Sequence, residues 1–300
     1  MNPPKKVTYT GAYVFARDLA YVKGVVDTLN RDRVDHTAIL RWSNGTWGQY
    51  MIPGCVASHC VIPESDRTVL CLVIDGSVHR ATPNGFSWEH IDESEAGPNL
   101  LRHMTDIRPI GQSVYAAGMA RMVYKRSGPG SWSRFDNGMR SPRSDPHITG
   151  FLSIDGCDEG SIYAVGFKGE MWYYDGKKWN PIDSPTNVKL EQVRCISPEQ
   201  VFACGARGIV LKGNRDRWSV VSHDATTKTL WGMEYFQESI YLADHSAIYT
   251  LKKDTLHQVD VGLNKEITTR NLHAKDGSLW SVGDKHIMVF DGRKWTELTP

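Results

Sequence analysis

The chain has 300 residues, with 35 basic and 34 acidic side chains and a formal net charge of +1. This balance argues against a protein that holds nucleic acid or an acidic membrane by bulk charge. The chain has no apolar stretch long enough to span a membrane, and its first residues, MNPPKKVTYTGAYVF, lack the apolar run of a signal peptide. We therefore expect neither a nucleic-acid nor a membrane partner.

One block of sequence recurs along the chain. It is clearest as SIYAVGFKGEMWYYDGKKWNPID at 161–183 and as SLWSVGDKHIMVFDGRKWTEL at 278–298. Further copies start at Ser113, Gln200 and Ser239. Self-similarity at a period of about 40 residues indicates a repeat architecture, and this period suits a propeller blade.

Two columns of residues align the copies. The first column is large and apolar, and consists of Tyr21, Leu70, Tyr115, Tyr163, Phe202, Tyr241 and Trp280. The second column follows a turn, and consists of Trp47, Trp88, Trp132, Trp179, Trp218, Leu256 and Trp295. The columns predict one domain over 1–300 with seven units, at approximately 6–52, 53–93, 99–137, 147–185, 188–223, 228–262 and 266–299.

Each unit predicts four short strands. In the fourth unit the strands are GFLSI, IYAVG, MWYYD and KWNPI, which alternate and are rich in β-branched and aromatic residues. Asn-Gly or Asp-Gly pairs join the third and fourth strands in several units and supply the positive φ of tight hairpins. The predicted fold is all-β, a seven-bladed β-propeller of four-stranded antiparallel blades. We expect the Trp column to pack between blades, because one indole buries a large apolar area.

The repeat resembles bacterial β-propeller repeats with an AVG…DG…W signature, which are distant relatives of the WD-repeat, kelch and BNR families. The resemblance covers residues 11–299 and implies the fold, but it names no subfamily. The chain lacks the Gly-His and Trp-Asp pairs of WD repeats and the Gly-Gly doublets of kelch repeats. It also lacks a clean Ser-x-Asp-x-Gly-x-Thr-Trp box.

The N-terminal unit allows two interpretations. Residues 17–30 show helix-like apolar spacing, yet residues 18–22 also echo the strand at 161–165. We favour strands on this echo. The first blade is then expected to pack on the seventh, with residues 7–10 as an extra edge strand.

Three loops are longer than the repeat requires. The two columns lie 26 residues apart in the first unit and 15 to 18 apart elsewhere, which indicates an insertion at 25–36. The connections at 91–103 and 135–148 are also extended. In a propeller these loop types emerge on one face, and insertions often map to a binding face. The alternative is drift, because added loop length costs little free energy.

The extended loops carry mixed charge with apolar anchors, which suits a protein interface. The predicted partner-binding residues are Asp32, Arg33, Glu93, Glu95, Met139, Arg140, Arg143 and His147.

Cysteine and histidine give weaker signals. None of the six cysteines, Cys55, Cys60, Cys71, Cys157, Cys195 and Cys204, forms a Cys-x-x-Cys pair. We interpret them as thiols in a reducing compartment, which favours the cytoplasm, and leave a bridge between Cys55 and Cys60 open. His59, His103, His147, His223 and His273 lie in or before predicted first strands, which line a propeller's channel. They do not share one register, so we expect no metal site, although a channel site stays the alternative.

Catalytic motifs are missing: the sequence has no Gly-x-Ser-x-Gly elbow, no phosphate-binding loop and no His-Glu-x-x-His. The favoured function is a non-catalytic binding module that grips another protein through the rim of blades 1 to 3, as an inhibitor or immunity protein. It would need no cofactor and would be a monomer on its own. The alternatives are a lyase or glycosidase acting at the channel mouth, and a scaffold subunit.

Overall fold

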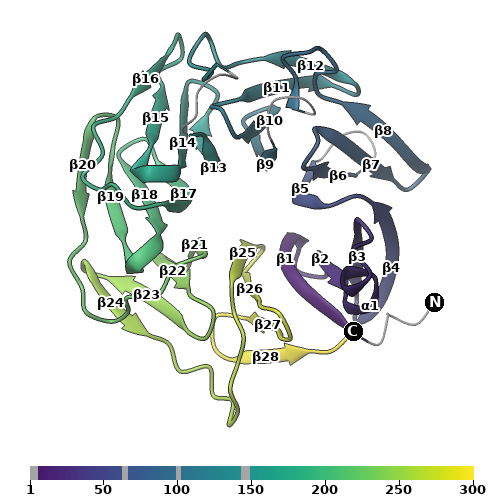
Figure 1. Ribbon diagram of the computed structural model, residues 1–300. Coiled ribbons are helices and arrows are strands. Elements are labelled where there is room, and N and C mark those ends of the chain that lie inside the picture. The colour runs from purple at the N-terminus through teal and green to yellow at the C-terminus, as the bar shows by residue number, and fades with distance from the viewer. Residues whose placement is uncertain (1–5, 63–66, 99–102, 143–148) are drawn as a thin grey trace. The chain divides into compact units, whose positions relative to one another are not determined.

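A computed structural model describes residues 6–62, 67–98, 103–142 and 149–300. Among them it has seven four-stranded antiparallel sheets, which are the blades of a β-propeller (Figure 1). The predicted fold class is therefore confirmed. The chain divides into two compact units, unit 1 (Met1–Cys55 with Val221–Pro300) and unit 2 (Val56–Val220), which are described one at a time.

Unit 1 holds blades 1, 6 and 7, each formed by four consecutive strands. The strands of blade 1 are β1 (Val7–Ala16), β2 (Leu19–Val26), β3 (His36–Ser43) and β4 (Thr46–Pro53). Those of blade 6 are β21 (Gly232–Phe236), β22 (Ser239–Ala243), β23 (Ile248–Lys252) and β24 (Thr255–Gln258). Those of blade 7 are β25 (Asn271–Lys275), β26 (Ser278–Val282), β27 (Ile287–Phe290) and β28 (Trp295–Leu298).

Unit 2 holds blades 2 to 5, with the same strand order. Blade 2 consists of β5 (Val56–Ile62), β6 (Thr68–Val73), β7 (Ser77–Thr82) and β8 (Gly85–His90). Blade 3 consists of β9 (Met104–Ile110), β10 (Ser113–Gly118), β11 (Val123–Gly128) and β12 (Ser131–Arg134). Blade 4 consists of β13 (Phe151–Asp158), β14 (Ser161–Gly166), β15 (Met171–Tyr174) and β16 (Trp179–Pro181). Blade 5 consists of β17 (Leu190–Ser197), β18 (Gln200–Gly205), β19 (Val210–Asn214) and β20 (Arg217–Val220).

The two sequence columns occupy fixed places in the blades. The first column lies on second strands and is buried in all seven blades, as the fully buried Tyr163 illustrates. The second column lies on fourth strands. The expectation that this column is packed away holds for Trp179, which is 7% exposed, but is wrong for Trp88, which is 43% exposed. The ring of Trp88 contacts His79 of its own sheet.

The N-terminal segment forms strands, as the echo of the repeat predicted. Its insertion contains a short helix, α1 (Asp27–Arg31), between β2 and β3. No helix in the described part of the chain is long and apolar enough to cross a membrane.

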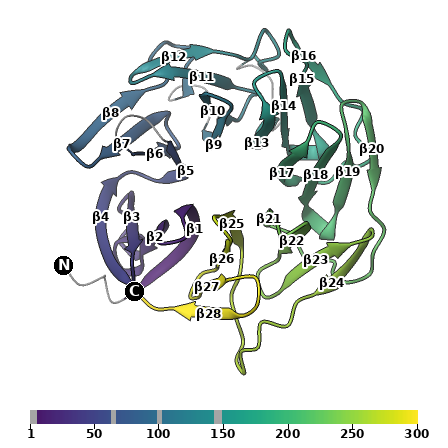
Figure 2. The same cartoon turned by 180° about the vertical axis from the view of Figure 1, so that it is seen from behind.

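Blades 1 and 7 pack together within unit 1, as expected (Figure 2). The backbone N–H of Ala12 donates to the Asn271 side chain at 2.8 Å, and that of Val14 donates to His273 Nδ1 at 3.1 Å. The expectation of an extra edge strand is wrong. Residues 7–10 are instead the start of β1, because Val7 already pairs with the far end of β2.

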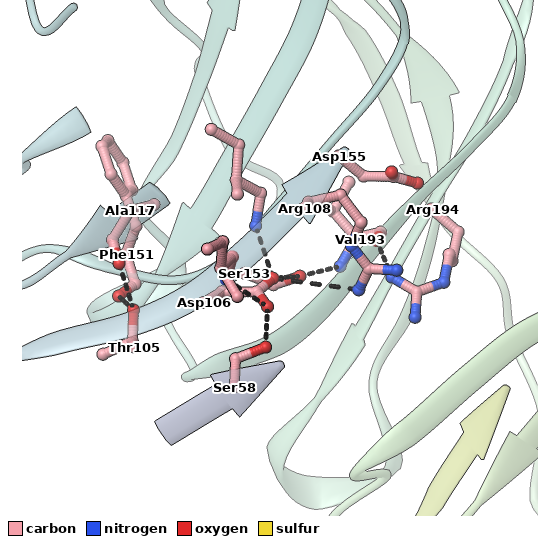
Figure 3. A network of polar contacts seen from close by, with 12 residues as sticks. Ser58, Thr105, Asp106, Arg108, Ala117, Phe151, Ser153, Asp155, Val193 and Arg194 are labelled. Atoms are coloured by element: carbon pink, nitrogen blue, oxygen red, sulfur yellow. Dashed lines mark hydrogen bonds and ion pairs between the residues drawn. The ribbon is translucent and has the colours of Figure 1, made fainter. Parts of the chain in front are cut away.

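Polar side chains link the first strands of neighbouring blades in unit 2 (Figure 3). Asp106 of blade 3 accepts a hydrogen bond from Ser58 of blade 2 at 2.8 Å and from the Ile154 N–H of blade 4 at 3.2 Å. Asp155 of blade 4 accepts from the Cys195 N–H of blade 5 at 2.9 Å. A first strand exposes backbone donors along its free edge, and these carboxylates satisfy them. Their role is therefore structural.

A disulfide between Cys157 on β13 and Cys195 on β17 joins blades 4 and 5, with the two Cα atoms 5.4 Å apart. This corrects the expectation that Cys157 and Cys195 are free thiols. The bridge left open between Cys55 and Cys60 is absent, since both are free. The signal was in the sequence: the separation of 38 residues is about one repeat, so both cysteines fall on corresponding strands of consecutive blades.

Removing this disulfide should lower the free energy of unfolding by about 2–4 kcal/mol, because the loop it closes in the unfolded chain is long. Urea unfolding with and without reductant measures the effect. Cys157→Ser plus Cys195→Ser should match the reduced wild type and ignore reductant, whereas the free-thiol control Cys55→Ser should respond like the wild type. An unfolding midpoint of the wild type that reductant leaves unchanged would contradict the bridge.

Candidate protein-binding face

In unit 2, the turns between second and third strands lie beside the connections between blades. Ala120 donates its N–H to the Thr149 carbonyl at 3.0 Å, and Ala206 donates to the Lys189 carbonyl at 2.9 Å. We call this end of unit 2 the loop face. It consists of the turns 74–76, 119–122, 167–170 and 206–209 and the connections 91–98, 135–142 and 182–189.

Asp92 anchors the connection from blade 2 to blade 3. Its carboxylate accepts hydrogen bonds from the Ser94 N–H at 3.0 Å, the Tyr124 hydroxyl at 2.9 Å and Arg134 Nε at 3.1 Å. Burial alone would raise the pKa of Asp92, but the hydrogen bonds from Ser94, Tyr124 and Arg134 outweigh it and lower the pKa to about 2. The ionised carboxylate thus holds this connection in place.

Acid should release this anchor. The pKa of Asp92 in the folded chain, about 2, lies below its usual 3.8, so the carboxylate stabilises the fold above the usual value and this contribution is lost as the pH falls towards 2. We expect the free energy of unfolding of the wild type to fall more steeply over this range than that of Asp92→Asn. Chemical denaturation at stepped pH measures both slopes, and parallel curves would contradict the anchor role.

Two of the predicted contact residues have partners inside the chain. Arg140 donates to Asp136 at 2.8 Å and to the Ala96 carbonyl at 2.6 Å, and its guanidinium lies over the Tyr124 ring. The Arg140 side chain is 12% exposed. Met139 is 8% exposed and belongs to the core that contains Trp179. Both residues therefore stabilise the loop face, and we do not carry them into the proposed contact surface.

The other predicted contact residues are placed as follows. Glu93 and Glu95 are exposed on the connection that Asp92 anchors, and neither makes an ion pair with a described residue. Asp32 and Arg33 are exposed directly after α1 and belong to unit 1. Arg143 and His147 lie outside the described residues. A rim that joins all of these residues stays a prediction.

Reasoning from loop length missed the turns of blades 4 and 5, which have ordinary lengths. These turns carry the exposed cations Lys168 and Arg207, each with a left-handed backbone. The signal in the sequence was a four-residue pattern, Gly-x-Lys/Arg-Gly, which occurs at 166–169 and again at 205–208.

Two histidines are used by the fold, and one of them, His273, belongs to the predicted channel set. His273 Nδ1 accepts from Val14, and His286 Nδ1 accepts from the Thr268 N–H at 2.9 Å. A ring nitrogen that accepts a backbone hydrogen bond holds the imidazole in one neutral tautomer. Within residues 6–62, 67–98, 103–142 and 149–300, no three His, Cys, Asp or Glu side chains are grouped as metal ligands would be.

A cavity of about 570 Å³ lies between blades 4 and 5, at the hairpins that join third and fourth strands. Asp175 in its wall accepts from the N–H groups of Lys178 at 2.9 Å and Lys177 at 3.0 Å. These backbone hydrogen bonds lower the pKa of Asp175. A carboxylate held ionised by its own turn is poorly suited to act as a general acid.

No family model matches the sequence. The immune protein Tsi7 of Pseudomonas aeruginosa PAO1 is 34% identical over 287 residues, which cover 94% of this chain and 94% of that protein.

Solved structures share the fold. The WD40 propeller domain of Doa1 has a TM-score of 0.74 at 10% identity and covers 98% of this chain and 96% of its own. YCF48 bound to a D1 peptide has a TM-score of 0.69 at 14% identity, with 96% and 93% covered. Virginiamycin B lyase from Staphylococcus aureus has a TM-score of 0.65 at 8% identity, with 82% and 84% covered. Because these proteins include a peptide-bound one and a lyase, the fold does not select a function.

Proposed function

This chain belongs to the family of the immune protein Tsi7, and we propose that it acts as an immunity protein that neutralises a protein toxin by binding it. The single observation that carries this proposal is the relationship itself, which extends over nearly the whole of both chains. The bacterial relative also supports grouping these blades with the bacterial AVG…DG…W repeats. Nothing in the relationship favours a scaffold subunit.

The proposed mode of action is blocking without chemistry. His273, His286 and the Asp175 carboxylate are used by the fold, which is in keeping with a protein that acts without a catalytic step, metal or cofactor. With a net charge of +1, we propose a protein partner rather than nucleic acid or membrane, and a monomer in its absence.

The proposed contact surface is the loop face of unit 2, and the α1 loop of unit 1 is proposed as a separate contact segment. Exposed charged residues on loops that a rigid scaffold positions are typical of binding sites. Asp92 and Arg140 fix the connections before the partner arrives, so less ordering is needed on binding. Glu93 and Glu95, and Asp32 and Arg33 in unit 1, then supply charge to the partner.

We keep the cytoplasm as the proposed compartment on the four free cysteines, while the Cys157–Cys195 disulfide is the observation against it and provides its test. In a reducing compartment, Cys157 and Cys195 should react with an alkylating agent added to intact cells. If the protein isolated from the alkylated cells still carries the Cys157–Cys195 disulfide, the protein resides in an oxidising compartment instead.

Growth rescue tests the function. We propose to test the product of the gene next to this one as the candidate toxin, expressed in a laboratory bacterium with and without this chain. The proposal predicts arrested growth with the toxin alone, restored growth with both proteins, and a stable complex of the two on gel filtration. Unrestored growth, or rescue without a complex, would refute an immunity protein that acts by binding.

Charge reversal tests the contact surface. Glu93→Lys plus Glu95→Lys should weaken the complex by about tenfold and leave the fold intact, because rim charges act on association. The matched control is Glu199→Lys plus Asp216→Lys, two exposed acidic residues outside the loop face of the same unit. Equal losses for the two variants would mean that the loop face is not the contact surface.

A further inference from the structure

Blades 4 and 5 present a cation at the same place. Lys168 has φ 56° and Arg207 has φ 58°, and each precedes a glycine with φ 71°. Two consecutive left-handed residues form the kind of tight turn that favours asparagine followed by glycine. Arg33, Arg215 and Lys253 adopt a left-handed backbone as well, so what distinguishes Lys168 and Arg207 is that they recur at equivalent turns of consecutive blades.

Neither cation is explained by the fold. A left-handed backbone costs free energy at any residue with a Cβ, and asparagine bears it better than a long side chain. Lys168 and Arg207 are exposed, and neither side chain makes an ion pair or hydrogen bond with a described residue. Arg215, at the hairpin between β19 and β20, is also exposed and left-handed, with φ 47°, so the recurrence of the two cations on the loop face, rather than strain, points to a role outside the chain.

Two further cations flank these turns. Lys189 lies between them: its carbonyl accepts from Ala206, and its ammonium lies 5.9 Å from the centre of the Phe167 ring. Arg121, in the turn of blade 3, pairs with Glu170 at the end of the blade 4 turn. We call Arg121, Lys168, Lys189 and Arg207 the basic arc.

The acidic partners within the basic arc are the less exposed members of their pairs. In the Arg121–Glu170 pair, the arginine side chain is 28% exposed and the carboxylate 12%. Lys189 pairs with Glu191 at 2.6 Å, and here the lysine is 34% exposed and the carboxylate 9%. The charge that faces solvent is therefore mainly positive.

We propose that the basic arc is the docking surface for an acidic segment of the partner protein. This inference rests on the proposed function, in which that partner is the toxin. The arc lies on the same loop face as the exposed Glu93 and Glu95, which belong to a different blade connection. On the turns and the connection that carry the arc, all of them described, the one exposed carboxylate is that of Asp183. Such a distribution of charge fixes the orientation of a protein partner, whereas the carboxylates would repel a phosphate backbone.

The test compares two charge reversals of equal size. Lys168→Glu plus Arg207→Glu changes the basic arc. Lys177→Glu plus Arg215→Glu changes exposed cations of the same two blades. These two residues lie in the hairpins at the opposite end of β15 and β19 from the loop face. With the neighbouring gene's product as the probe, the first pair should weaken binding by about tenfold or more at low salt, mostly through slower association, and the second should change it little.

A second probe does not depend on the toxin. A polyglutamate peptide should bind the wild type and the hairpin variant at low salt but not the basic-arc variant. A short DNA duplex that binds the wild type more tightly than polyglutamate, and is lost on reversal of the arc, would overturn the proposal in favour of a nucleic-acid surface.

The two proposals fail differently. If the wild type neutralises the toxin and both reversed variants bind it equally well, the basic arc is wrong and the proposed function stands. If the toxin is neither bound nor neutralised, the proposed function is wrong, and equal binding of polyglutamate to all three proteins would refute the arc as well.

Discussion

Replacing Glu89 with alanine should lower the free energy of unfolding by about 3–5 kcal/mol, because it leaves a buried cation without its counter-charge. Arg126 of blade 3 donates to Glu89 of blade 2 through Nε at 2.9 Å and Nη2 at 2.8 Å. The two side chains are 2% and 3% exposed. Trp132 Nε1 also donates to Glu89 at 2.9 Å, so the carboxylate joins the two blades through three hydrogen bonds.

Urea unfolding measures this loss, and two variants separate its parts. Glu89→Gln keeps an acceptor for Trp132 and one for Arg126 but removes the charge, so it should fall between the wild type and the alanine variant. Glu89→Leu plus Arg126→Leu removes both fully buried charges and should recover part of the loss, while the partly exposed Arg80, 4.0 Å from Glu89, loses its ion pair in either variant. A loss below about 1 kcal/mol for Glu89→Ala would show that water reaches Arg126.

Replacing Trp179 with alanine should cost about 3–5 kcal/mol through the cavity it leaves. The indole is 7% exposed and contacts the rings of Tyr174 and Phe135. Its Nε1 donates to the Phe135 carbonyl at 2.8 Å, so the change also removes a hydrogen bond to the first residue of the connection 135–142. The loss should therefore loosen part of the loop face as well as the core.

Trp88→Ala is the matched control for Trp179→Ala, because Trp88 holds the same place in blade 2 and is 43% exposed. It should cost much less, and urea unfolding of the two variants gives the comparison directly. If the two variants lose equal free energy of unfolding, the position of a tryptophan in its blade, rather than its burial, determines how much it stabilises the fold.

The fold was predictable because every blade repeats one burial pattern. A large residue such as Tyr163 is fully buried at the same place in its sheet as Tyr115, and Trp179 follows the next hairpin. Because the same position must be buried in every blade, large apolar residues recur at a regular spacing, and that spacing is visible in the sequence. The insertion at 25–36 was found in the same way, and the helix-like spacing at 17–30 corresponds to a helix only in its last residues, where α1 begins at Asp27.

The roles of individual loop residues were less predictable. Loop length drew attention to Arg140, yet its guanidinium is used by Asp136 and Ala96, and no feature of the sequence specifies those partners. Lys168 and Arg207 were overlooked because they lie in turns of ordinary length, and loop length was the signal that was followed. Contacts between blades depend on how each turn is built, and the repeat pattern does not encode that.

Amide hydrogen exchange, measured for this chain with and without the neighbouring gene's product, tests the central claim most directly. Binding through the loop face predicts new protection at 91–98, 167–170 and 206–209, together with loss of toxicity. It predicts no change at the hairpins 175–178 and 214–217 of the same blades. Protection confined to those hairpins, or no protection anywhere while the toxin stays active, would contradict an immunity protein that acts through this face.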